Sequence, residues 1–166
     1  MDVRDATAAD VAAINALYNA TAVTTTVAWT DEPESLEMRQ RWFEQRQAAG
    51  HAVLVATDDG AVIGFAAYGD FRDSTKWSGY RFTVEHSVHV AGTHHGRGVG
   101  RALMEALVAR ARAQGFHVMM GAVAAENAGS VEFHRRLGFT EVGLLPEVGY
   151  KFGRWLDLVL LRRPLG

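Results

Sequence analysis

The sequence predicts a single mixed α/β domain, in which a mostly antiparallel sheet is flanked by helices. Apolar stretches of strand length alternate with segments of helical period across all 166 residues, and no linker or repeat interrupts them. A strand, helix and strand between residues 82 and 123 predict a right-handed parallel crossover. Hairpin signals on either side predict antiparallel neighbours, so the sheet should be mixed.

The first half of the chain predicts two helices and a hairpin. Thr7 is suited to cap the first helix and Ser35 the second, and Gly50 ends the second. Asp58-Asp59-Gly60 is a strong turn signal between two apolar runs. The expected elements are a strand at Val3, helices at 6–20 and 35–50, and strands at 51–57 and 61–69.

The second half predicts the crossover and a final hairpin. An apolar face built on Leu103 and Leu107 predicts a long helix, which Gly115 ends. The expected elements are a loop at 70–79, a strand at 81–90, a helix at 99–114, a strand at 117–123, a short helix at 127–137, and strands at 140–148 and 152–162.

Composition narrows the function classes. A net charge of -2 with scattered Lys and Arg gives no electrostatic footprint for nucleic acid. No apolar run approaches the ~20 residues that span a bilayer, and no leader marks secretion. We therefore expect a cytoplasmic protein that binds neither nucleic acid nor a membrane. The absence of cysteine excludes disulfides, thiolate metal sites and an acyl-cysteine intermediate.

The run from Val88 to Arg101 reads as a strand, a glycine-rich turn and a helix start. Glycines at 96, 98 and 100 let a phosphate approach the backbone, and the helix start offers unpaired N–H groups and a positive dipole end. The spacing does not give G-x-G-x-x-G, and no Gly-Lys-Ser/Thr follows, which disfavours a dinucleotide or ATP site. The alternative is a glycine-rich turn without a ligand.

The six residues from His95 to Gly100 resemble the (Gln/Arg)-x-x-Gly-x-(Gly/Ala) loop of the GNAT family of N-acetyltransferases, although His95 departs from the usual Gln or Arg. The resemblance implies the acyl-CoA N-acyltransferase fold, with acetyl-CoA as cofactor and its pyrophosphate on this loop. It also implies that the preceding strand holds the acetyl carbonyl. The implied cofactor-binding residues are Val88, His89, Val90, Gly96, Arg97, Gly98, Val99, Gly100, Arg101, Asn127 and Ser130.

A second segment, from Asn127 to Phe139, resembles the family's Asn-x-x-(Ser/Ala)-x-x-x-(Tyr/His)-x-x-x-Gly-Phe pattern. Asn127 is suited to cap the helix, and in the family this Asn also bonds the pantetheine arm. His134 stands where many relatives carry a tyrosine that protonates the departing thiolate. A histidine there can donate that proton, accept one from the amine, or only orient and pack.

Glu85 is the expected general base. Strand alternation puts Glu85, Ser87 and His89 on one face, so Glu85 shares a strand with the glycine turn. An ammonium must lose a proton before it attacks a thioester, and a carboxylate in a partly dry cleft suits that task. The alternative is a Glu85 that only pairs with an arginine. Nothing places a base beside Ser87, so we expect direct transfer without a covalent intermediate.

A closer resemblance, to phosphinothricin and methionine sulfoximine N-acetyltransferases, covers nearly the whole chain and includes the distinctive block from Gly149 to Asp157. It implies an acceptor with the α-amine of a glutamate-like amino acid, and a homodimer with Lys151, Arg154 and Trp155 at the interface. The alternative is that these three residues simply belong to a core strand and form no interface. The expected substrate-binding residues are Arg72, Thr75, Lys76, Trp77, Arg81, Glu85, His86 and Ser87.

Two rival functions remain open. The first is an acetyltransferase for another amine, such as a polyamine, an aminoglycoside or a protein N-terminus, although the cations Arg72, Lys76 and Arg81 favour an anionic acceptor. The second is a noncatalytic acetyl-CoA-binding module. A metal site is disfavoured, because His86 and His89 lie on opposite strand faces and the chain lacks a His-x-x-x-His helix.

Overall fold

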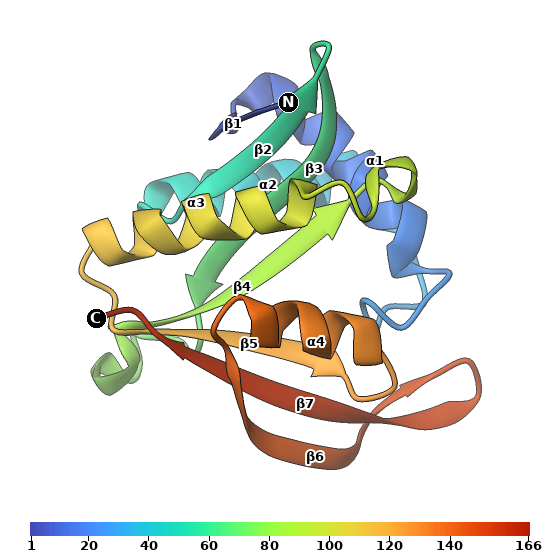
Figure 1. Cartoon of the computed structure of the whole chain (residues 1–166), viewed down its shortest axis with the longest axis vertical. Coiled ribbons are helices and arrows are strands. Elements are labelled where there is room, and N and C mark those ends of the chain that lie inside the picture. The colour runs from blue at the N-terminus through green and yellow to red at the C-terminus, as the bar shows by residue number, and fades with distance from the viewer.

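The computed structural model describes residues 1–166, which build one seven-stranded sheet in the order β1-β2-β3-β4-β5-β7-β6 (Figure 1). Only β4 and β5 pair in parallel, and every other pair is antiparallel, as predicted. The strands are β1 Asp2–Asp5, β2 Val53–Asp58, β3 Ala61–Asp70, β4 Thr83–Val90, β5 Val118–Ala124, β6 Thr140–Lys151 and β7 Arg154–Pro164.

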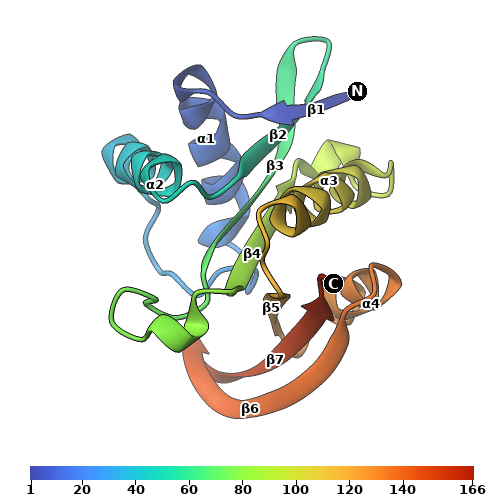
Figure 2. The same cartoon turned by 90° about the vertical axis from the view of Figure 1, so that its left-hand side faces the viewer.

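Two pairs of helices cover the two faces of the sheet (Figure 2). The smaller core joins α1 and α2 to β2 and β3 through residues such as Ile14, Phe43 and Phe65. The larger core joins α3 to the opposite face through Leu103 and Leu107. The helices are α1 Val11–Ala22, α2 Leu36–Ala48, α3 Val99–Ala113 and α4 Ala128–Arg136. None of them combines the length and the apolar composition needed to cross a bilayer.

Local capping explains where the first helices begin. The Ser35 hydroxyl accepts a hydrogen bond from the Met38 N–H at 3.2 Å, which confirms it as a cap. At the first helix, the Thr7 N–H and hydroxyl both donate to the Asp10 carboxylate, which Arg4 also holds. This cluster tightens the entry into a 3-10 turn, Ala8–Asp10, so α1 begins later than the predicted Ala6.

The parallel pair β4–β5 separates after three residue pairs. Pairing runs from Thr83↔Val118 to Glu85↔Met120 and then stops, although both strands continue. We call this point of separation the fork. Beyond it, the facing edges of β4 and β5 no longer bond to each other, so backbone groups and side chains there are available to line a site.

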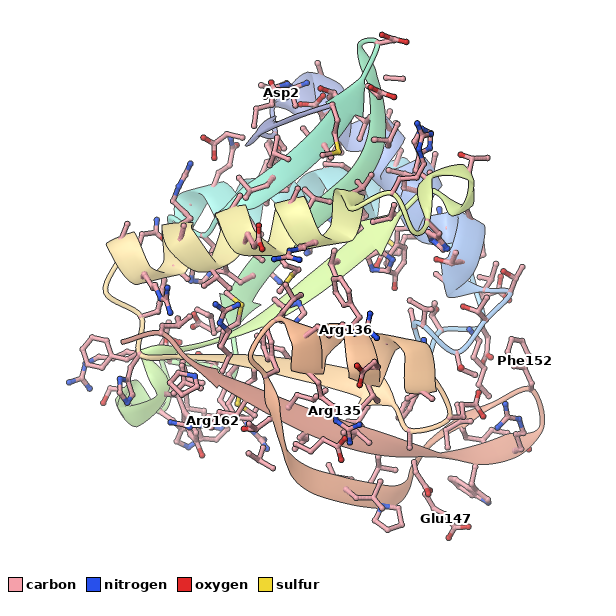
Figure 3. All side chains as sticks on the ribbon, viewed as in Figure 1. Asp2, Arg135, Arg136, Glu147, Phe152 and Arg162 are labelled. Atoms are coloured by element: carbon pink, nitrogen blue, oxygen red, sulfur yellow. The ribbon has the colours of Figure 1, made fainter.

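The final hairpin turns later than predicted. The chain reverses at Phe152 and Gly153, between the paired residues Lys151 and Arg154, instead of between Val148 and Phe152 (Figure 3). Both turn residues have positive φ, 54° and 73°, as a tight two-residue hairpin turn requires. The sequence does not predict a turn at Phe152, because Asn or Asp usually occupies that position.

Candidate active site

The glycine turn presents a row of unpaired backbone donors. Gly96 and Gly98 adopt positive φ values of 73° and 82°, and a Cβ atom at either position would meet nothing within 4 Å. Gly98 is the N-cap of α3 and offers no side chain to the first turn. No backbone N–H from Gly96 to Arg101 donates a hydrogen bond within the chain. This geometry suits a phosphate group, which accepts several N–H bonds at a helix N-terminus.

A cleft of about 730 Å³ extends from this turn to α4; we call it the glycine-turn cleft. Asn127 caps α4 by accepting the Ser130 N–H at 3.0 Å, which confirms the predicted cap. Arg136 lies on the side of α4 toward α3, whereas Arg135 lies toward β6 (Figure 3). Nine of the expected cofactor residues line this cleft: Val88, Val90, Gly96, Gly98, Val99, Gly100, Arg101, Asn127 and Ser130.

Two expected cofactor residues lie elsewhere. Arg97 is exposed and does not line the cleft. His89 faces α1 and packs on Phe65 and Tyr18, and burial together with Arg39 lowers the pKa of His89 to about 4. His89 contributes only to the adjoining cavity at the fork.

The contact that His95 makes explains why this position departs from the family pattern. Its Nε2 lies 2.9 Å from the Val90 carbonyl oxygen, so it donates a hydrogen bond back to the end of β4. The ring thereby closes the turn. The groups that this leaves available to a phosphate in the turn are the backbone N–H groups and the Arg101 side chain, which also pairs with Glu105.

The cleft continues into a cavity of about 210 Å³ at the fork; we call it the fork cavity. The two share Val88, Val90, His95, Asn127 and Ser130. The cavity ends at His86, Ser87 and His134, and Thr26 and Val27 close another side. His86 and Ser87 also line the small cavity that holds Glu85, so the two cavities meet at these residues of β4.

His86 and His134 form a buried imidazole pair at the fork. Their Nε2 atoms are 3.2 Å apart, and His134 Nδ1 lies 2.6 Å from the Ser130 carbonyl oxygen. Because a carbonyl only accepts, His134 Nδ1 carries a proton, and in the neutral pair His86 donates its Nε2–H to His134. Gly121 makes room for the rings, since a Cβ there would lie 3.0 Å from His86 Nε2.

Both nitrogens of His134 are thus used inside the protein, and only 3% of the residue is exposed. Burial lowers the pKa of His134, although its bond to the Ser130 carbonyl opposes this shift. Burial, reinforced by His134, lowers the pKa of His86 to about 3. Both rings are neutral near pH 7, and direct proton exchange between His134 and a ligand requires that Nε2 leave His86.

Glu85 faces α2, in a small cavity of about 190 Å³ with Ser87, Asp70 and Arg46. Burial raises the pKa of Glu85, and the nearby Arg72 guanidinium partly opposes this effect. A carboxylate with a raised pKa binds a proton more readily than an exposed one, which suits a general base. Arg46 was not predicted; its guanidinium lies against Gly69 and makes no ion pair, and only the folded chain brings it to this site.

The loop between β3 and β4 stays exposed. Of its expected substrate residues, only Arg72 is close enough to change the Glu85 pKa. Lys76 lies over Trp77, Arg81 lies over Phe82, and Thr75 bonds Asp73. The structure brings Glu85, His86 and Ser87 together but leaves Thr75, Lys76, Trp77 and Arg81 on the surface. No three His, Asp or Glu side chains are grouped to hold a metal ion.

The comparisons with known proteins agree with this geometry. A model of the acetyltransferase (GNAT) domain matches residues 3–160. The chain belongs to the GNAT acetyltransferase family. This finding, with the sheet order above, confirms the predicted fold class and family.

Several relatives are similar over nearly the whole chain. The L-methionine sulfoximine/L-methionine sulfone acetyltransferase of Pseudomonas aeruginosa is 48% identical and covers 96% of this chain and 92% of its own. The phosphinothricin N-acetyltransferase of Alcaligenes faecalis is 39% identical, covering 94% and 78%. The yncA acetyltransferase of Salmonella typhimurium, solved with acetyl-CoA, is 43% identical, with a TM-score of 0.95 and coverage of 100% and 94%.

Proposed function

We propose that residues 1–166 form one N-acetyltransferase domain that transfers the acetyl group of acetyl-CoA to the α-amine of a small glutamate-like amino acid. The observation that carries this proposal is continuity: the glycine-turn cleft, with its unpaired N–H row, opens into the fork cavity, and His86 and Ser87 at the end of that cavity also line the small cavity that holds Glu85. A cysteine-free chain that uses this donor fits a cytoplasmic enzyme.

Each group of residues has its own role in the proposed reaction. Backbone N–H groups from Gly96 to Arg101 would hold the pyrophosphate of acetyl-CoA, and the free edge of β4 from Val88 to Val90 would offer N–H groups to the acetyl carbonyl oxygen. Acetyl-CoA, when bound, supplies an acyl group activated as a thioester. Glu85 accepts the proton of the ammonium, directly or through water, so that the neutral amine can attack. As the amine nitrogen bonds the acetyl carbon, the C–S bond breaks and the departing thiolate takes a proton from solvent. His134 assists by accepting the His86 N–H, which holds the floor of the fork cavity in place.

Two findings favour the glutamate-like acceptor. The similar enzymes from Pseudomonas and Alcaligenes are named for methionine sulfoximine, methionine sulfone and phosphinothricin. Arg72, whose charge acts on Glu85, offers a planar guanidinium suited to a carboxylate or a tetrahedral phosphorus or sulfur head. A cationic acceptor would instead need acidic residues at this position.

A panel of amines, read by thiol release from acetyl-CoA, tests the proposal. Methionine sulfoximine, methionine sulfone and phosphinothricin should turn over with higher kcat/KM than spermidine, an aminoglycoside or an alanine-terminated peptide. Preference for one of the last three would overturn the acceptor class. Acetyl-CoA binding without turnover of any amine would make the protein a noncatalytic binding module.

We also propose that the protein is a homodimer. β6 is an edge strand, and its hairpin with β7 exposes an apolar surface of the kind that partners cover. Its exposed apolar residues are Val142, Leu144, Leu145, Val148, Tyr150, Phe152 and Trp155, the last 61% exposed. Light scattering coupled to gel filtration should give twice the chain mass of 18.1 kDa, and a monomer at micromolar concentration would refute the dimer.

A further inference from the structure

The loop that follows α1 forms a wall of the fork cavity. Thr26 and Val27 from this loop line the fork cavity together with β4 and β5 residues. No residue from 20 to 30 lines the glycine-turn cleft. A change in the position of this loop should therefore alter the shape of the fork cavity, where the proposed transfer takes place, and leave the glycine-turn cleft unchanged.

A buried lysine fastens this loop from far along the chain. Lys151, at the end of β6, is only 1% exposed, which is unusual for lysine. Its Nζ donates to the carbonyl oxygens of Ala22, Thr25 at 2.6 Å and Ala28 at 2.8 Å. Three N–H groups meet three carbonyl oxygens, so every donor of the ammonium is satisfied. The resemblance placed Lys151 at a subunit interface, but the structure places it inside its own chain.

Two further contacts join the same loop to the β6–β7 hairpin. The Trp29 indole lies directly on Gly149, where a Cβ atom would come within 2.1 Å of the ring. The Thr26 hydroxyl donates a hydrogen bond to the Glu126 carboxylate. The same carboxylate accepts hydrogen bonds from both terminal guanidinium nitrogens of Arg154, with N–O distances of 2.7 and 2.9 Å. Glu126 and Arg154 are partly exposed, so this link should be weaker than the buried contacts of Lys151.

We propose that Lys151 is a positioning residue for the amine acceptor: its ammonium fixes the loop that carries Thr26 and Val27, and thereby sets the shape of the acceptor end of the fork cavity. Lys151 touches neither substrate. This inference rests on the proposed acetyl transfer and extends it, because it assigns the hairpin a role in acceptor recognition within the same chain.

Replacement of Lys151 by methionine tests the role of the ammonium. Lys151→Met keeps most of the side-chain volume but leaves three buried carbonyl oxygens without a donor. The KM for methionine sulfoximine should rise by about 10-fold or more, whereas acetyl-CoA affinity by calorimetry should change less than about 3-fold. Arg41→Met, which removes an exposed cation from α2, is the matched control and should change neither value.

Chemical rescue separates a positioning role from general damage. The chain has no cysteine, so Lys151→Cys carries a single thiol. Alkylation with 2-bromoethylamine in denaturant forms one S–C bond, with bromide as the leaving group, and places an ammonium at the reach of lysine. After refolding, the amine KM should return to within about 3-fold of wild-type protein taken through the same steps. Alkylation with ethyl iodide adds no charge and should not restore it.

Arg154→Met provides a test that does not depend on refolding. It cuts only the partly exposed link through Glu126, so the protein should fold, and the amine KM should rise by about 2- to 5-fold with acetyl-CoA affinity unchanged. An unchanged amine KM in both folded variants, or an equal loss of acetyl-CoA affinity, would overturn the proposal. A wild-type protein that acetylates no amine would instead refute the proposed function.

Discussion

The two proposed ends of the site, one for the phosphates of acetyl-CoA and one for the amine acceptor, are built in different ways. At the phosphate end, a continuous run from Val90 to Arg101 supplies the turn, the helix start and the unpaired N–H groups. At the acceptor end, the walls come from the loop after α1, from α2, from β4 and from α4, and the β6–β7 hairpin holds the first of these in place. The phosphate end depends on backbone conformation, and the acceptor end depends on side chains that only the folded chain brings together.

The largest effect should come from Glu85→Gln, which removes the proposed base at the acceptor end. The amide keeps the size of the side chain but cannot take the proton of the ammonium. We expect kcat for methionine sulfoximine to fall by about 10²- to 10⁴-fold, measured by thiol release at saturating substrates. Unchanged turnover at saturating amine would remove Glu85 from this role.

Gly98→Val should have the next largest effect, and at the opposite end. Gly98 has a φ of 82°, which is strongly unfavourable for a β-branched residue, and a side chain there would extend into open space at the glycine-turn cleft. Acetyl-CoA affinity should fall by about 10- to 100-fold in calorimetry, whereas kcat at saturating acetyl-CoA should stay near the wild-type value. Gly79→Val, a change at an uncrowded surface glycine outside both cavities, is the control. Normal affinity in Gly98→Val would refute the phosphate assignment.

A pair of substitutions at His86 tests the fork between the two ends. His86→Gln retains an N–H that can reach His134 Nε2, whereas His86→Leu leaves that buried nitrogen unpaired. We expect His86→Leu to lose about 1–3 kcal/mol of unfolding free energy in urea, and His86→Gln to lose less. The kcat should also fall further in His86→Leu than in His86→Gln. Equal stability and equal kcat in the two variants would show that the imidazole bond contributes nothing.

The smallest effect concerns pH. Glu85 acts as a base only when deprotonated, so kcat/KM for the amine should rise with pH through the Glu85 pKa, which burial has raised. Arg72 lowers the pKa of Glu85, so Arg72→Gln should move this acidic limb toward higher pH. The pH profiles of the two proteins provide the measurement. A shift toward lower pH would contradict this effect of the Arg72 charge on Glu85.

The same contrast explains how much of the molecule could be predicted from its sequence. The glycine turn, the Asn127 cap and the strand that carries Glu85 are local features, and their residues are neighbours in the chain. His86 and His134 are 48 residues apart, and Lys151 lies more than 120 residues from the carbonyl groups it binds. Such contacts depend on where the sheet brings β4, α4 and β6, which periodicity does not specify.

His95 and Phe152 show the limits even of local patterns. His95 occupies the position of a phosphate-binding side chain in the family pattern, yet it bonds the Val90 carbonyl within the turn. Phe152 has the positive φ of a tight turn, although its side chain predicts strand. In both cases the backbone geometry around the residue determines its role, and the residue type alone suggests a different one.

If the two ends act separately on cofactor and acceptor, the loss of the Glu85 carboxylate should leave cofactor binding intact, and a calorimetric titration of acetyl-CoA into Glu85→Gln measures this. We expect a dissociation constant within about 2-fold of the wild-type value, in a protein whose turnover has fallen by at least about 100-fold. A loss of acetyl-CoA affinity of about 10-fold or more in this variant would contradict it.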